Sequence, residues 1–371
     1  MREGGQKMQE RFSVLRRYTL SLVLTLAITA MMVTPVFAQG VSFKGKMVRI
    51  IINLGSASAL SANYQVLAPF IARYLPGKPK IIVEAKPGGR GALGASHVFN
   101  DVKPNGETMG TFLFLTGALI TGDKLPVDIS KFVYVGSTGQ GTMLYVRTDT
   151  GLKSADDFVN PPKQLIMGNA SPNAGISLSV KLFLNALGHK GKYKALHGYR
   201  GMLGMLQSVR SGETNMSYLH AGQFFARLPG FKKEGNIFGI MEFGLLGEDG
   251  KTHGTPGAGM PTVEAVWEKL MPNSLDSKEY KTYHKVMRLE KPISWLNVLP
   301  PGTPEKYRKV WSDAMAAAFK DPEYLGLLAK RGAPSATFFS GEKTVQLTNQ
   351  IITNMKDPDI KAAIASVFTK K

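Results

Sequence analysis

The hydrophobic positions of the first hundred residues alternate between short apolar runs and longer amphipathic segments. Residues 47–52 read Met-Val-Arg-Ile-Ile-Ile and are mostly apolar and β-branched, which predicts a buried strand. Residues 61–74 repeat apolar side chains every three or four positions and predict a helix. A strand over 81–85 then leads into a glycine loop over 87–94. A helix follows to about residue 100.

A strand-like run over 108–115 completes a β-α-β-α-β order. This order predicts a parallel sheet with helices on both faces. Two further strands are expected over 131–136 and 143–147, on either side of a loop over 137–141. A second α/β series therefore begins near residue 142.

The second series is built like the first. A strand over 164–168, a loop over 169–175 and a helix over 176–187 come first. A strand over 193–197 and a helix that opens at Tyr199 follow, and the series closes with strands over 213–219 and 236–243. The order predicts two α/β lobes with few residues between them, and a ligand cleft between lobes is the usual use of this arrangement.

The last third is mostly helical. Thr303 and Pro304 are placed as N-cap and first residue of a helix to about residue 319, and Asp321 caps the next. We therefore predict a signal peptide over 1–38, lobe 1 over 39–141, lobe 2 over 142–245 and a return to lobe 1 over 246–371.

The first 38 residues have the three parts of a secretory signal peptide. Arg11, Arg16 and Arg17 form a basic region, residues 20–33 form an apolar core, and Ala38 offers a small residue before the cleavage point. The alternative, an uncleaved membrane anchor, is disfavoured because the apolar run is short for a span. The sequence thus predicts an exported, periplasmic protein.

Composition excludes several classes of protein. The chain has no cysteine, so disulfide scaffolds and cysteine-ligated metals are excluded. Its net charge of +19 is spread without a Lys/Arg run, which argues against nucleic-acid binding. The six histidines do not fall at metal-ligand spacing, and no nucleophile elbow or Walker loop is present. We expect no enzyme activity, no metal and no cofactor.

One pattern suits a dinucleotide. Gly89, Gly91 and Gly94 match G-x-G-x-x-G after a strand and before a helix. However, Pro87 and Gly88 give the wrong shape for the tight first turn, and the pattern follows the second strand rather than the first. A tight turn with close helix–strand packing explains the glycines better.

Four blocks, taken in order, resemble the extracytoplasmic solute receptors of tripartite tricarboxylate transporters, the Bug-type or TctC-like family. They are the glycine loop over 87–91 with Pro104–Asn105–Gly106, the stretch over 165–171, the stretch over 197–201, and the segments over 259–264, 300–304 and 320–323. The resemblance spans nearly the whole chain after the signal peptide. It implies a two-lobed periplasmic binding protein of type II topology, a monomer that closes on a small organic carboxylate and delivers it to a membrane permease.

The resemblance also implies which residues hold the ligand. Three segments are expected to line the cleft: a first loop over 54–61, a second loop over 171–177, and a third edge over 199–201. They would offer backbone amides, hydroxyls and a helix N-terminus to the carboxylate. Gln140 is placed at the crossing between the lobes, and Arg200 is the candidate for a charged contact. The expected ligand-binding residues are Leu54, Gly55, Ser56, Ser58, Ser61, Gln140, Ser171, Asn173, Ala174, Gly175, Ser177, Tyr199, Arg200 and Gly201.

The first loop departs from the family pattern. The family has a glycine pair and then an aspartate there, whereas this chain has Ser58, Ala59 and Ser61. The loss of this carboxylate has two readings: the loop admits a more anionic or differently shaped acid, or the usual ligand of the family is not bound. Two other functions stay open: an accessory protein that hands its closed form to a membrane sensor, and an exported α/β hydrolase, which lacks a recognisable nucleophile and base.

Overall fold

The computed structural model describes residues 40–113, 115–171, 175–247, 249–330 and 336–368. The compact unit begins at Ser42. The predicted signal peptide over 1–38 and two expected ligand-binding residues, Asn173 and Ala174, lie outside the described residues.

The first sheet has six strands in the order β13-β4-β12-β3-β1-β2. Their bounds are β1 Met47–Ile52, β2 Lys80–Ala85, β3 Thr108–Leu113, β4 Val133–Gly139, β12 Trp295–Leu299 and β13 Thr337–Ser340. Strands β2 and β3 pair with β1 in parallel, as their β-α-β connections require. Strand β12 is antiparallel to both β3 and β4, and β13 is antiparallel to β4.

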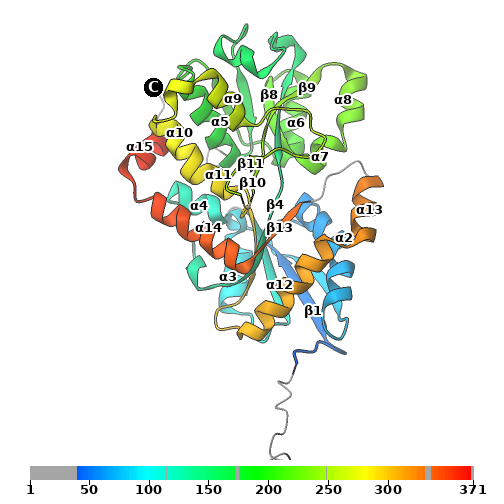
Figure 1. Cartoon of the computed structure of the whole chain (residues 1–371). Helices are drawn as coiled ribbons and strands as arrows, with labels where there is room; N and C mark the ends of the chain where they lie inside the picture. The colour runs from blue at the N-terminus through cyan, green and yellow to red at the C-terminus, as the bar shows by residue number, and fades with distance from the viewer. Residues whose placement is uncertain (1–39, 114, 172–174, 248, 331–335, 369–371) are drawn as a thin grey trace, which may run out of the picture. The chain divides into compact units, whose positions relative to one another are not determined.

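Helices cover both faces of the first sheet (Figure 1). Helices α2 and α12 pack against each other on one face, and α3, α4 and α14 lie on the other. The alternation along β1 explains this, because Ile51 joins the core with Ala95 and Val98 of α3 while its neighbours Ile50 and Ile52 point away. The helices are α2 Ala59–Tyr74, α3 Ala92–Asn100, α4 Leu115–Thr121, α12 Glu305–Phe319, α13 Pro322–Lys330 and α14 Gly341–Asn354.

The second sheet has five strands in the order β7-β6-β8-β5-β9. They are β5 Thr142–Arg147, β6 Ile166–Asn169, β7 Lys194–His197, β8 Met216–His220 and β9 Ile237–Phe243. Strands β7 and β8 pair with β6 in parallel, whereas β5 is antiparallel to β8 and β9. The helices of this part are α5 Gly175–Ala186, α6 Gly201–Ser211, α7 Ala221–Phe225, α8 Leu228–Glu234 and α9 Val263–Leu270.

Both sheets follow one plan. In the first sheet, β1 lies between β2 and β3, and in the second, β6 lies between β7 and β8. Beside β3, and likewise beside β8, lies an antiparallel strand whose chain has just come from the other sheet. That inserted strand is β12 in the first sheet and β5 in the second. The chain therefore has the two-lobed α/β architecture of type II periplasmic binding proteins.

The chain crosses between the sheets where β4 ends at Gly139 and β5 begins at Thr142. It returns after α10 Lys278–Thr282, a π-helical turn over Tyr283–Met287 and α11 Arg288–Glu290. The two crossings touch, because a Cβ on Gly139 would lie 2.6 Å from the carbonyl oxygen of Lys291. Only a glycine fits at this point of close approach.

The remaining elements are short. A hairpin of β10 Leu245–Leu246 and β11 Thr252–His253 follows β9, and α15 Pro358–Ser366 packs against α10 and α5. Turns of 3₁₀ helix occupy Gly89–Gly91, Ile129–Lys131, Thr148–Thr150, Ala155–Val159 and Pro272–Ser274. None of the described helices is both long and apolar enough to cross a membrane.

The structure corrects four expectations. Neither sheet is wholly parallel, because each takes in an antiparallel strand from the crossing. Residues 137–139 extend β4 rather than forming a loop, since β13 and β12 pair with them. The expected strand over 108–115 ends at Leu113, and Leu115 already begins α4. Pro304, not Thr303, is the N-cap of α12, and the Thr303 hydroxyl donates to the carbonyl of Pro300 at 2.8 Å instead.

Candidate ligand-binding site

The first expected loop connects β1 to α2 and is braced by its own side chains. The Ser58 hydroxyl accepts the backbone N–H of Ser61 at 3.2 Å, which makes Ser58 the N-cap of α2. Ser61 is buried, whereas Leu54 and Gly55 are half-buried and Ser56 is exposed. Of this loop, Ser56, Ala57 and Ala59 are exposed to solvent.

The second expected loop lies between β6 and α5. Its described residues are Ser171, which is half-buried, Gly175, which starts α5, and Ser177 in the first turn of that helix. Ser177 is fully buried and its hydroxyl has no hydrogen-bond partner among the described residues. Asn169, the last residue of β6, is also fully buried, and its side-chain oxygen lacks a partner too.

The third expected edge lies beside the second loop. The backbone N–H of Tyr199 donates to the carbonyl of Asn169 at 3.4 Å, so the turn after β7 adjoins the end of β6. Arg200 is exposed at the N-cap position of α6, and no hydrogen bond is described for its side chain at that cap. Gly201 has a φ of +63°. Gln140 is half-buried in the crossing between β4 and β5.

A buried ion pair in the return crossing was not expected from the sequence. Glu290 is 9% exposed and Lys291 is 6% exposed, and the Lys291 Nζ lies 3.1 Å from the Glu290 Oε2. A Cβ on Gly175 would lie 3.1 Å from the same carboxylate oxygen. The Glu290 carboxylate therefore faces the N-terminus of α5, within the second expected loop.

Glu290 and Lys291 also act on the end of β8. Burial raises the pKa of Tyr218, and the charge of Glu290 raises it further. Burial lowers the pKa of His220 to about 3, and the positive charge of Lys291 adds to the effect. His220 is thus neutral at neutral pH, and its Nδ1 lies 3.1 Å from the Thr142 hydroxyl oxygen. The pair lies where the ends of β6, β8 and the start of α5 meet.

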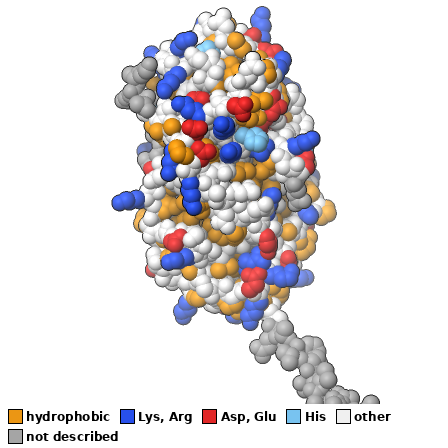
Figure 2. Space-filling view, turned by 60° about the vertical axis from the view of Figure 1, so that its left-hand side comes forward, with side chains coloured by type: hydrophobic (Ala, Val, Ile, Leu, Met, Phe, Trp, Pro, Cys, Tyr) orange, Lys and Arg blue, Asp and Glu red, His pale blue; other side chains and the backbone are white. Residues whose placement is uncertain are grey.

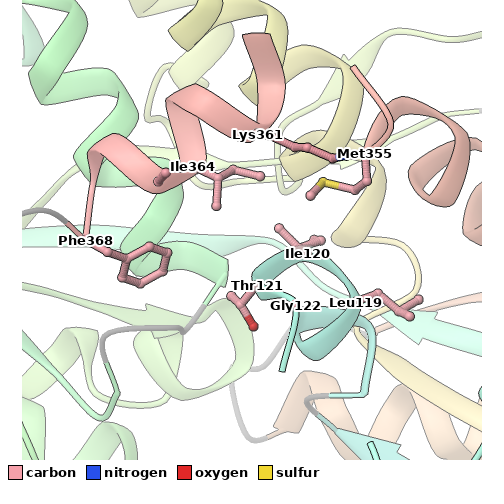
Figure 3. A pocket seen from close by; sticks show the side chains of 9 residues that line it. Leu119, Ile120, Thr121, Gly122, Met355, Lys361, Ile364 and Phe368 are labelled. Atoms are coloured by element: carbon pink, nitrogen blue, oxygen red, sulfur yellow. The ribbon is translucent and has the colours of Figure 1, made fainter. Parts of the chain in front are cut away.

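Two surface hollows lie away from these loops. One, of about 690 Å³, is lined mostly by apolar residues of α4, α15 and the turn between α14 and α15, among them Leu119, Met355 and Phe368 (Figure 3). The other, of about 740 Å³, lies between α12 and β13. None of the expected ligand-binding residues lines either hollow. We place the candidate site at the loops, because they bring unpaired polar groups and a helix N-terminus together and the two hollows do not.

The charge on the surface is mixed. On the face shown in Figure 2, Lys and Arg side chains are interspersed with Asp and Glu rather than gathered in a stripe. Among the described residues, no group of His, Asp or Glu is arranged to hold a metal ion.

The comparison with solved structures agrees with this architecture. A TctC solute-binding protein from Polaromonas, solved without ligand, superimposes with a TM-score of 0.59 at 14% identity, over 88% of this chain and 99% of that chain. MatC from Rhodopseudomonas palustris with bound malate gives 0.57 at 16% identity, over 86% of this chain and 98% of that chain. Another R. palustris protein, solved with adipate, gives 0.60 at 16% identity, over 86% and 97%.

No protein-family model and no curated protein sequence matches the chain. The structural likeness is therefore one of fold. It confirms the resemblance to the TctC and Bug-type solute-binding proteins and the predicted fold class.

Proposed function

We propose that this protein is an extracytoplasmic solute-binding receptor for a small organic carboxylate. The observation that carries the proposal is the position of the crossings. The segment over 139–142 and the segment over 291–295 join two sheets of equal plan. Gly175, at the start of α5, faces Glu290 of the return crossing, and the turn after β7 adjoins the end of β6. Two lobes joined by short crossings are suited to hinge closure around a ligand.

The chemistry of the loops suits an acid. Helix α2 begins at the first loop, and the positive end of a helix dipole attracts a carboxylate without a charged side chain. Structural neighbours were solved with malate and with adipate, which supports a dicarboxylate as the ligand of this fold. The exposed Arg200 would add a charge-assisted contact at the third edge.

The receptor would act in the periplasm. The expected signal peptide ends at Ala38, so the exported form would begin at Gln39. The closed form would dock as a monomer on the permease of a tripartite tricarboxylate-type transporter, since ligand binding shifts the population toward it. N-terminal sequencing of the protein from the periplasmic fraction tests the export step, and a first residue other than Gln39 would contradict the predicted cleavage.

A binding screen tests the receptor function. Thermal shift of the purified protein against C3–C6 dicarboxylates, tricarboxylates and aromatic acids should give a saturable shift with at least one acid, because a ligand that binds only the folded state stabilises it. Calorimetry then gives the stoichiometry, expected to be one per chain. If no acid shifts the transition, the receptor proposal fails. If a bound acid is converted to product, the result supports the hydrolase alternative instead.

A further inference from the structure

The two lobes repeat a short sequence at equivalent positions. Residues 90–94 read Arg-Gly-Ala-Leu-Gly and residues 200–204 read Arg-Gly-Met-Leu-Gly. Both segments follow the second strand of their sheet, and both second residues, Gly91 and Gly201, have a positive φ. The repeat aligns β1 with β6, and with them two asparagines: Asn53, which directly follows β1, and Asn169, the last residue of β6.

The aligned asparagines differ in one respect. Asn53 is fully buried and saturated: its Nδ2 donates to the carbonyl of Leu113 at 2.9 Å, and its Oδ1 accepts the N–H of Leu113 at 3.1 Å. Asn169 is equally buried and its Nδ2 donates to Met167, but its Oδ1 has no partner in the described part of the chain. In the first lobe the Asn53 side chain is fully hydrogen-bonded to Leu113, whereas in the second lobe the Asn169 Oδ1 can still accept a hydrogen bond.

The open acceptor has two neighbours of similar character around the same loop. The hydroxyl of Ser177, in the first turn of α5, has no described partner. The Oε2 of Glu290, which faces Gly175, makes no hydrogen bond of good geometry to a described residue, although Lys291 Nζ lies 3.1 Å away. A buried polar atom left unpaired costs about 1–3 kcal/mol. Asn169 Oδ1 and Ser177 Oγ are two such atoms, whereas Glu290 Oε2 is ion-paired with Lys291 and keeps lone pairs for one further donor.

Asn169 Oδ1, Ser177 Oγ and Glu290 Oε2 can all pair with a hydrogen-bond donor of a ligand. An amide oxygen and a carboxylate oxygen only accept hydrogen bonds, and a hydroxyl can do both. A plain carboxylate, which also only accepts, cannot pair with Asn169 or Glu290. The N-terminus of α5 attracts an anion, yet a carboxylate of the protein already lies against it.

On this basis, and resting on the receptor function proposed above, we infer that the ligand is a carboxylate that also carries a hydrogen-bond donor, a hydroxyl or an ammonium group, and that Asn169, Ser177 and Glu290 bind this donor. The ligand carboxylate then lies toward the first loop and Arg200. Asn169, Ser177 and Glu290 thus select for the substituent rather than for the acid.

The test compares acids that differ only in this donor. Calorimetry on the purified protein would use three matched sets: succinate, malate and aspartate; glutarate, 2-hydroxyglutarate and glutamate; adipate, 2-hydroxyadipate and 2-aminoadipate. In the set of the right length, the hydroxy or the amino acid should bind at least tenfold more tightly than the plain diacid, since one paired donor in a buried site contributes that much. Whichever of the two binds better identifies the donor.

Each outcome has a distinct meaning. If the plain diacid binds as tightly as its substituted partners, the inference is overturned and the receptor function stands. If no acid in any set binds, and the broader carboxylate screen is also empty, the receptor function itself is overturned and the inference with it.

Matched variants assign the effect to the loop. Ser177→Ala should reduce the preference for the substituted acid about fivefold while leaving the plain diacid unchanged, because only the donor loses its partner. Ser179→Ala is the control, since Ser179 is equally buried but its hydroxyl already donates to the Gly175 carbonyl at 3.0 Å. Glu290→Gln keeps the side-chain shape and should weaken an ammonium-bearing ligand more than a hydroxyl-bearing one. Equal affinity ratios in wild type, Ser177→Ala and Glu290→Gln would overturn the assignment.

Discussion

The phenol of Tyr64 donates a hydrogen bond of 2.5 Å to the Oδ1 of Asn297, across 233 residues of sequence. Tyr64 lies on α2 and Asn297 on β12, the strand inserted into the first sheet. The hydroxyl of Thr111 on β3 donates to the same oxygen at 2.9 Å, and the Asn297 Nδ2 donates to Thr138 on β4 at 3.2 Å. One buried amide thus fixes the returning strand between its two neighbours and against the helix layer.

This network makes Asn297 more important for stability than any single partner. Asn297→Leu leaves the hydroxyls of Tyr64, Thr111 and Thr138 unpaired in the core and should lower the free energy of unfolding by about 3 kcal/mol. Tyr64→Phe removes one donor while Thr111 still serves the Oδ1, and should lower it by about 1 kcal/mol. Urea denaturation of both variants measures the difference. A loss for Asn297→Leu no larger than that for Tyr64→Phe would show that the network is not cooperative.

The strands formed from local patterns were predictable from sequence, and the inserted strand was not. The apolar runs over 47–52 and 81–85 match β1 and β2 closely, because each run is a local pattern that is followed directly by the helix that packs on the sheet. Strand β12 was not assigned, although a return to lobe 1 was expected. Its place depends on pairing with β3 and β4 far back in the chain, which no local pattern encodes.

The same limit applies to the candidate site. The loops after β1, β6 and β7 follow from the strand–loop–helix order, so the sequence could indicate them. Glu290 and Lys291 could not be identified, because charged neighbours in a helical segment ordinarily indicate a solvated surface. They are buried only because the chain crosses back between the lobes there. One local pattern, the repeat of Arg-Gly-x-Leu-Gly over 90–94 and 200–204, relates the two lobes to each other. It is too short to be recognised as a repeat before the strand order of the two sheets is known.

The two repeated turns make a matched pair for a glycine test. Gly91 has a φ of +92°, and a Cβ there would lie 2.2 Å from the Asn53 Nδ2. Gly91→Ala must therefore displace a buried, saturated side chain as well as strain the backbone, and should cost about 3 kcal/mol of unfolding free energy.

Gly201→Ala is the counterpart. The φ of Gly201 is +63°, but nothing lies within 4 Å of an added Cβ. Only backbone strain remains, so the cost should be about 1 kcal/mol. Thermal unfolding of the two variants provides the comparison, and equal losses would argue against the role of Asn53 in holding the first turn.

Half-buried His220 should make stability depend on pH below neutrality. Burial and then Lys291 lower its folded pKa to about 3, from an ordinary value of 6.5. Between these values the unfolded state binds the proton and the folded state does not, so stability is fully present above 6.5 and is lost as the pH falls toward 3. From pH 7 to pH 5 the loss from this residue should be up to about 2 kcal/mol, less in proportion to its partial exposure to solvent.

The variant His220→Gln retains a side chain that can pair with Thr142 but does not titrate. Its unfolding free energy, measured by denaturant titration at several pH values, should fall less steeply between pH 7 and pH 5 than that of the wild type. Parallel curves for wild type and His220→Gln would show that His220 titrates normally.

Arg200 gives the most direct test of the third edge. If its guanidinium contacts the ligand carboxylate, Arg200→Ala should weaken binding of the tightest acid about tenfold or more, since a charge-assisted contact is lost. Arg210→Ala is a suitable control: Arg210 lies on the same helix α6, but its guanidinium is already paired with Glu234 at 2.7 Å. Because both changes remove one positive charge, a general electrostatic effect would weaken both variants alike and would weaken them less at high salt. A loss confined to Arg200→Ala places that residue at the ligand, and unchanged affinity removes it from the site.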